Sequence, residues 1–102
     1  MKMAVVMTMR WAGVTPEQYD SVRDTVRWEQ DTPTGAVLHV ASFEGGALHV
    51  TDVWSSQADF ERFFADRLAA AVKEAGIEGE PETSFRPIHR RFVAPGVTGA
   101  AS

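Results

Sequence analysis

The chain has 102 residues, of which 44% are hydrophobic and 24% charged, a composition typical of a single globular domain with a modest core. Fourteen acidic and ten basic residues give a net charge of −4, which disfavours nucleic-acid binding because phosphate recognition needs a basic surface. The absence of cysteine excludes disulfides, cysteine–zinc sites and thiol nucleophiles.

No apolar stretch approaches the ~18 residues that a membrane-spanning helix needs. The apolar run from Met3 to Met9 is too short for a signal peptide, and Arg10 follows it without a cleavage-like site. We therefore expect a cytoplasmic protein with no membrane partner and no nucleic-acid partner. A short basic cluster is expected to be a solvated strand end. Its members are Arg86, His89, Arg90 and Arg91.

The first predicted strand covers Met3 to Arg10 and is apolar on both faces, which is typical of a central strand covered on both sides. A loop over Trp11 to Val14 follows. A helix over Pro16 to Arg27 is predicted next, because Thr15 and the glutamine three residues later form a capping box.

Two further strands are predicted over Ala36 to Glu44 and Ala47 to Trp54. The pair Gly45-Gly46 between them is typical of a two-residue hairpin turn.

A second helix is predicted to begin at Ser55 or Ser56 and to end near Gly76, with a wide apolar face that we expect to be core. This face comprises Phe60, Phe63, Phe64, Leu68 and Val72. The last predicted strand covers Thr83 to Val93, and Pro87 within it indicates an edge position or a bulge.

The order of these elements predicts an α+β fold, a ferredoxin-like βαββαβ sandwich over residues 1–95 with a flexible tail over residues 96–102. The two helices cover one sheet face, and the other face still carries apolar residues. A second copy of the same sheet is the simplest cover. We therefore expect a homodimer whose sheets pack together into an α/β barrel.

The stretch Asp52-Val53-Trp54-Ser55-Ser56, followed by Phe60, resembles the dimeric α/β-barrel superfamily, in particular its antibiotic-biosynthesis-monooxygenase and haem-degrading branches. The Met-rich first strand and Pro87-Ile88-His89 resemble actinobacterial members. The resemblance covers roughly Met3 to Val93 and implies the fold. The superfamily includes cofactor-free monooxygenases, haem-degrading enzymes, isomerases, polyketide cyclases and members without known activity, so it does not select one function.

The haem-degrading branch carries a haem-ligating histidine on its second helix, whereas Ser56 to Ala75 contains no histidine here. We therefore expect no haem, no other cofactor and no tightly bound metal. A metal held by His39 and His89 together with Asp52 is the alternative that the residues leave open.

The hairpin fixes which residues of its two strands oppose one another. Counting outward from Gly45-Gly46 places His39 opposite Asp52, and Val37 opposite Trp54. Opposed Cβ atoms lie ~4.5–5.5 Å apart, close enough for an imidazole–carboxylate hydrogen bond. The functional hypothesis is a general base, His39, oriented by Asp52. The alternative is a partly solvated cross-strand polar pair with Trp54 in the core.

Tyr19 and Trp54 are expected to line an apolar pocket beside this pair and to bind substrate, with His89 as a further substrate-binding residue. One hypothesis is a small cofactor-independent enzyme (monooxygenase, cyclase or isomerase) acting on an aromatic or polyketide-like molecule, with His39 and Asp52 as its catalytic residues. The other is a non-catalytic homodimer that binds a small molecule or assists another enzyme. A cavity reached by both His39 and Asp52 favours the enzyme, and a closed apolar interior favours the binding protein.

Overall fold

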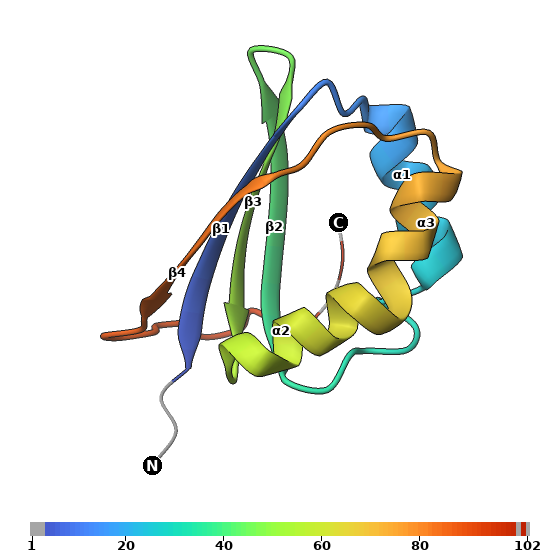
Figure 1. Cartoon of the computed structure of the whole chain (residues 1–102). Helices are drawn as coiled ribbons and strands as arrows, with labels where there is room; N and C mark the ends of the chain where they lie inside the picture. Colours follow the sequence, from blue (N-terminus) through green and yellow to red (C-terminus); the bar gives the residue numbers. More distant parts are fainter. Residues whose placement is uncertain (1–3, 100, 102) are drawn as a thin grey trace.

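The structure is a computed structural model that describes residues 4–99 and 101. Four antiparallel strands form one sheet in the order β2-β3-β1-β4, and the helices all lie on one face of this sheet (Figure 1). The predicted α+β ferredoxin-like order is confirmed. The elements are β1 (Val5–Ala12), α1 (Pro16–Val26), β2 (Ala36–Glu44), β3 (Ala47–Trp54), α2 (Gln57–Phe63), the π-helix η1 (Phe64–Leu68), α3 (Ala69–Glu74) and β4 (Glu82–Pro87).

Strand β1 is central, as predicted, because it pairs with β3 on one side and β4 on the other. The predicted start at Met3 lies outside the described residues. The predicted end at Arg10 is wrong, since Trp11 and Ala12 continue the pairing with β3. The Trp11 side chain is buried, and its indole Nε1 donates a hydrogen bond to the Glu78 carbonyl at 2.9 Å. This burial keeps the chain in the sheet for two residues more than the sequence pattern indicated.

Helix α1 begins as predicted. The Thr15 hydroxyl accepts a hydrogen bond from the Gln18 backbone at 3.1 Å, and the Gln18 side chain accepts one from the Thr15 backbone at 3.0 Å. Together they satisfy two backbone donors that a helix start leaves free. The helix ends at Val26 because Arg27 adopts a left-handed conformation, with φ of 61°.

The hairpin of β2 and β3 has the predicted bounds. Gly45 and Gly46 both have positive φ, 61° and 73°, which the favoured two-residue turn requires. The predicted pairing of Val37 with Trp54 is wrong: Ala36 takes that position, and Val37 is the extra residue of a β-bulge.

The start of β2 is anchored by the residue before it. The Gly35 carbonyl accepts a hydrogen bond from the Ser55 backbone at 2.7 Å, just beyond the end of β3. Gly35 has φ of 87°, and a Cβ at this position would overlap the Asp59 side chain. Only glycine therefore allows the backbone to approach α2 this closely. The bulge at Val37 lies two residues further along the chain.

The second helical segment is broken where the sequence predicts one continuous helix. Ser56 caps α2 by accepting a hydrogen bond from the Asp59 backbone at 3.1 Å. A turn of π-helix, η1, then separates α2 from α3. Arg67 of η1 donates hydrogen bonds to the carbonyls of Val26, at 2.9 Å, and Asp31, at 2.8 Å. This segment is thereby tied to the end of α1 and to the connector between α1 and β2.

Strand β4 is shorter than the predicted Thr83 to Val93, because it ends at Pro87. Pro87 lies opposite Val5, the first residue of β1, so the following residues have little partner strand to pair with. One further backbone bond, from Ile88 to the carbonyl of Ala4 at 2.9 Å, continues the contact.

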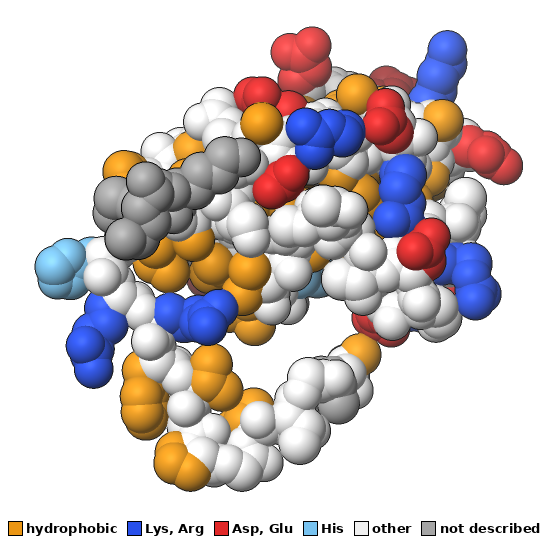
Figure 2. All heavy atoms as spheres, turned by 90° about the horizontal axis from the view of Figure 1, so that it is seen from below, with side chains coloured by type: hydrophobic (Ala, Val, Ile, Leu, Met, Phe, Trp, Pro, Cys, Tyr) orange, Lys and Arg blue, Asp and Glu red, His pale blue; other side chains and the backbone are white. Residues whose placement is uncertain are grey.

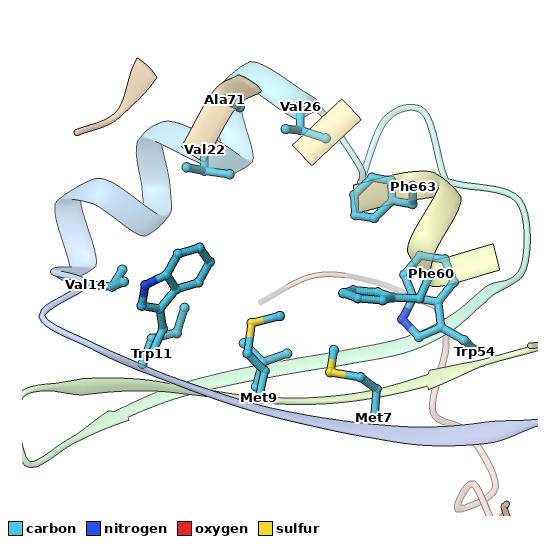
Figure 3. Packing of buried hydrophobic residues seen from close by; sticks show 12 residues of the cluster. Met7, Met9, Trp11, Val14, Val22, Val26, Trp54, Phe60, Phe63 and Ala71 are labelled. Atoms are coloured by element: carbon cyan, nitrogen blue, oxygen red, sulfur yellow. The ribbon is translucent and has the colours of Figure 1, made fainter. Parts of the chain in front are cut away.

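The hydrophobic core lies between the sheet and the helices. Figure 3 shows Met7, Met9 and Trp11 pointing from β1 toward the helices, which contribute further buried side chains from the other side. Trp54 packs against Phe60 and Phe63, with ring centroids 5.5 Å apart in each pair. The expected core role of these two phenylalanines is confirmed.

The other face of the sheet carries no helix (Figure 1). Leu38 and Val40 of β2 are half-exposed, at 50% and 52%. Beyond β4 the chain forms an arc that stands off the body, with hydrophobic side chains exposed along it (Figure 2). The exposed large hydrophobic residues of this arc are Phe92, Val93 and Val97. Within the described residues, no helix is long and apolar enough to cross a membrane.

Candidate functional site

A cavity of about 220 Å³ lies between the sheet and the helices, within the hydrophobic core. Side chains from β1, β2, β3 and every helical element line it, and most of them are apolar. Both His39 and Asp52 line this cavity, as does Tyr19. A short row of polar side chains therefore meets an otherwise apolar interior.

The predicted pairing of His39 with Asp52 is confirmed in register and in contact. The two residues are direct cross-strand partners, and His39 Nδ1 lies 2.7 Å from Asp52 Oδ1. The Asp52 side chain is 7% exposed, whereas that of His39 is 33% exposed. The carboxylate is thus enclosed, and the imidazole bridges it to the more open side of the site.

The second oxygen of Asp52 is also occupied. Trp54, two residues along β3 on the same face, donates its indole Nε1–H to Asp52 Oδ2 at 2.9 Å. An indole N–H can only donate, and an ionised carboxylate can only accept. The pattern therefore assigns the Nδ1 proton to His39, which leaves Nε2 as the basic nitrogen of the neutral ring.

Tyr19 reaches this basic nitrogen from α1. Its hydroxyl lies 2.6 Å from His39 Nε2, and the two ring planes are parallel within 3° with centroids 6.0 Å apart. The rings are thus joined end to end. Burial raises the pKa of Tyr19 to about 12, with a further contribution from the negative charge of Glu29. The phenol is therefore protonated at neutral pH and donates to His39.

One residue of the site was missed by the sequence analysis. Trp28 lies on the connector after α1, lines the cavity and packs edge-on against His39, with ring centroids 5.3 Å apart. Its ring also contacts that of Tyr19, at 5.8 Å. The only available signal was a large aromatic residue just beyond a helix end, which the helical spacing of apolar residues does not select.

The structure does not bring His89 to the site. His89 is exposed and follows β4, whereas His39 is on β2 at the opposite edge of the sheet. His49 is on β3 but faces away, with Nε2 3.4 Å from the Glu44 carbonyl. Among the residues that the structure describes, no group of three or more histidine, aspartate or glutamate side chains could hold a metal ion.

The arrangement is suited to proton transfer at the wall of an apolar chamber. Four side chains from three elements form one hydrogen-bonded row: Tyr19, His39, Asp52 and Trp54. A carboxylate that holds one imidazole nitrogen stabilises the imidazolium formed when the other nitrogen takes a proton. The apolar walls are suited to a hydrophobic ligand.

Comparison with solved structures identifies several proteins of the same fold. The monooxygenase ActVA-Orf6 of Streptomyces coelicolor, solved with nanaomycin D, has a TM-score of 0.60 and 18% identity, covering 91% of this chain and 94% of that chain. SnoaB, a cofactor-independent oxygenase from Streptomyces nogalater, has a TM-score of 0.59 and 15% identity, covering 93% and 99%.

A protein of unknown function from Nitrosomonas europaea is similar to the same degree, with a TM-score of 0.63, 15% identity and coverage of 93% and 98%. No family model matches the sequence. No curated protein matches it either. The predicted resemblance to antibiotic-biosynthesis-monooxygenase-like proteins is confirmed at the level of the fold. The fold alone does not decide the activity.

Proposed function

We propose that this protein is a cofactor-independent enzyme that removes a proton from a compact aromatic or polyketide-like molecule, with His39 and Asp52 as its general base. The observation that carries the proposal is that both side chains line one cavity and are hydrogen-bonded to each other at 2.7 Å. A purely apolar interior would have favoured a simple binding protein.

The aromatic character of the ligand is inferred from the cavity walls. Trp28, Trp54 and Phe60 are among the residues that line the cavity. Its volume of about 220 Å³ is below the ~300–1,000 Å³ typical of ligand pockets, which favours a small and flat molecule. One protein of the same fold, ActVA-Orf6, was solved with a small-molecule ligand, nanaomycin D, which supports a small molecule as the ligand.

Deprotonation of a phenol or of an acidic carbon is a common first step for three reactions. The resulting anion can donate an electron to dioxygen, attack an internal carbonyl group, or take its proton back at another carbon. These outcomes correspond to oxygenation, cyclisation and isomerisation. The base is the same in all three, so the proposal concerns the proton-transfer step.

The test is a thermal-shift screen of hydroxynaphthalenes and anthrones, followed by mass spectrometry of products formed in air. We expect hits that raise Tm and are converted. The substitution His39→Ala should then lower the rate by ~10²–10⁴-fold, the usual contribution of a general base. His49→Ala is the matched control, because His49 faces away from the cavity, and its rate should be unchanged.

The competing function is a non-catalytic small-molecule-binding or accessory protein. It predicts hits that raise Tm without any product, and equal binding by wild type and His39→Ala. That combination of results would reject the enzyme. In both cases we propose a cytoplasmic homodimer whose second copy covers the open sheet face.

A further inference from the structure

We infer that Tyr19 is a catalytic residue: its hydroxyl, and not the His39 ring, meets the acidic group of the substrate and passes the proton on to His39. This inference rests on the proposed function and assigns its proton-transfer step to a further residue. Three observations carry it: the occupied nitrogens of His39, the end-to-end geometry of the two rings, and the place of Tyr19 in the cavity wall.

Both nitrogens of His39 are already engaged. Nδ1 is held by Asp52 at 2.7 Å, and Nε2 by the Tyr19 hydroxyl at 2.6 Å. An imidazole offers only these two positions in its plane. Trp28 packs edge-on against the His39 ring, with centroids 5.3 Å apart, and restricts the approach of a substrate from that side. A substrate can therefore reach Nε2 directly only after it displaces Tyr19.

The tyrosine itself remains open to a ligand. Its O–H group donates a hydrogen bond to Nε2, and the oxygen keeps lone pairs that can accept a hydrogen bond from a ligand. Tyr19 lines the cavity, and its ring is held by Trp28 at 5.8 Å and by Phe43 at 6.2 Å. The hydroxyl is thus fixed between the base and the chamber.

The step balances without any further reactant. The substrate O–H or C–H bond breaks, its electron pair stays on the substrate, and its proton forms a new O–H bond with Tyr19 Oη. The original Tyr19 proton moves at the same time to His39 Nε2. The products are a substrate anion, a neutral tyrosine and an imidazolium paired with the Asp52 carboxylate.

The relay needs His39 because Tyr19 is a neutral phenol, whose pKa burial raises from 10.0 to about 12. A tyrosine of this pKa does not ionise at neutral pH, so it cannot act as a base from a resting tyrosinate. It can accept a proton only while it gives its own away. His39 Nε2, which already accepts a hydrogen bond from the Tyr19 hydroxyl, is the acceptor for that proton.

The substitution Tyr19→Phe separates the two arrangements because they predict different effects on the rate. Phenylalanine keeps the ring contacts and removes only the hydroxyl. If Tyr19 carries the relay, the rate on any substrate found should fall by ~10²–10⁴-fold. If Tyr19 merely blocks His39, the base is uncovered and the rate should stay the same or rise. Ser21→Ala, on the exposed side of α1, is the matched control.

A second measurement needs no natural substrate. The probe is para-nitrophenol, whose anion is yellow, bound at a pH below its own pKa. Wild type should bind it as the anion, and His39→Ala should bind it uncharged. With the relay, Tyr19→Phe should also bind it uncharged, whereas anion binding that persists or tightens in Tyr19→Phe would overturn the relay and leave His39 as the direct base.

The two proposals fail in different ways. Failure of wild type to ionise the bound phenol, or equal ionisation by His39→Ala, would reject the general base and the relay with it. Little bound para-nitrophenolate anion in His39→Ala, together with as much anion in Tyr19→Phe as in wild type, rejects only the relay. Urea unfolding of each variant identifies the folded fraction to which the signal is normalised.

Discussion

Asp52 is the one polar or charged residue that is buried in the part of the chain that the structure describes. Its side chain is 7% exposed, and both carboxylate oxygens accept hydrogen bonds, one from His39 and one from Trp54. A buried carboxylate without such partners would be strongly destabilising. The same two bonds fix the direction of every proton in the row, because a carboxylate can only accept.

Asp52→Asn should therefore preserve the fold but reverse the tautomer of His39. The amide can accept from Trp54 with its oxygen, and its NH₂ group then faces His39 Nδ1, which must become an acceptor. The proton moves to Nε2, which then donates to Tyr19 instead of accepting. We expect a rate reduction comparable to that of His39→Ala, because a protonated Nε2 has no lone pair to take a proton, together with a tautomer change visible in the imidazole ¹⁵N shifts. Unchanged shifts would refute the assignment made here.

Tyr19 gives a pH-dependent prediction that can be followed directly, because it is the only tyrosine in the chain. Burial raises its pKa from 10.0 to about 12, Glu29, Asp52 and Asp20 add to the rise, and Arg23 opposes it. Between these pH values the unfolded chain loses the phenol proton while the folded chain keeps it. Stability should therefore be constant below pH 10 with respect to this group and should decrease from about pH 10 to about pH 12.

The measurement is urea unfolding of wild type and Tyr19→Phe across that pH range. Other titrating groups are common to both proteins, so the difference between their stabilities isolates the phenol. The free energy of unfolding of the wild type should fall relative to that of Tyr19→Phe as pH rises. A difference independent of pH would mean that Tyr19 ionises equally in the folded and unfolded chains.

At the level of the elements, the features that depend on residues close in sequence, such as a helix start or a hairpin register, were predictable. The capping box at Thr15 fixed the start of α1, and Gly45-Gly46 fixed the hairpin register and hence the contact of His39 with Asp52. The hydrogen bond from Tyr19 to His39 was not predictable, because it depends on how α1 lies over β2. Register within a hairpin is local, whereas the placement of a helix on a sheet depends on the whole core.

Two irregularities also escaped the sequence analysis, for the same reason. The π-helix η1 is accompanied by tertiary hydrogen bonds, since Arg67 reaches the carbonyl of Val26 at the end of α1 and that of Asp31 on the α1–β2 connector. The bulge at Val37 lies two residues after Gly35, whose carbonyl is bound by the Ser55 backbone. Neither set of hydrogen bonds can be predicted from the periodicity of apolar residues.

Gly35→Ala tests the close approach that begins β2, with Gly13→Ala as the matched control. Both glycines have similar positive φ, 87° and 84°, so an alanine Cβ costs ~1–2 kcal/mol of backbone strain at either site. At Gly13 the added Cβ meets nothing within 4 Å, whereas at Gly35 it overlaps the Asp59 side chain. We expect Gly35→Ala to lower the free energy of unfolding by ~1–3 kcal/mol more than the control. Equal losses in urea unfolding would show that α2 moves aside freely.

At the level of the whole molecule, one layer of helices leaves the second sheet face open. Leu38 and Val40 are half-exposed on that face. The arc beyond β4 also carries exposed apolar side chains (Figure 2). A chain of this size gains stability from burying such surface against another copy.

We therefore predict that sedimentation at micromolar concentration gives about twice the 11.2 kDa chain mass. Val40→Glu should shift the equilibrium to the monomer, because it places a charge on the open face. Thr25→Glu, on the exposed side of α1, should leave the dimer intact. A stable wild-type monomer would contradict the barrel arrangement.

The hairpin register has a further consequence for how the site could arise or be lost. Successive residues of a strand point to opposite faces, so one residue inserted into β2 between His39 and the turn would reverse the direction of His39. The imidazole would then lie on the open face with His49, and Asp52 would lose its partner. A single codon gained or lost there would remove the acid–base pair and leave the strand order unchanged. Close relatives with and without chemistry can therefore share one scaffold, and strand length in this hairpin is the feature that should distinguish them.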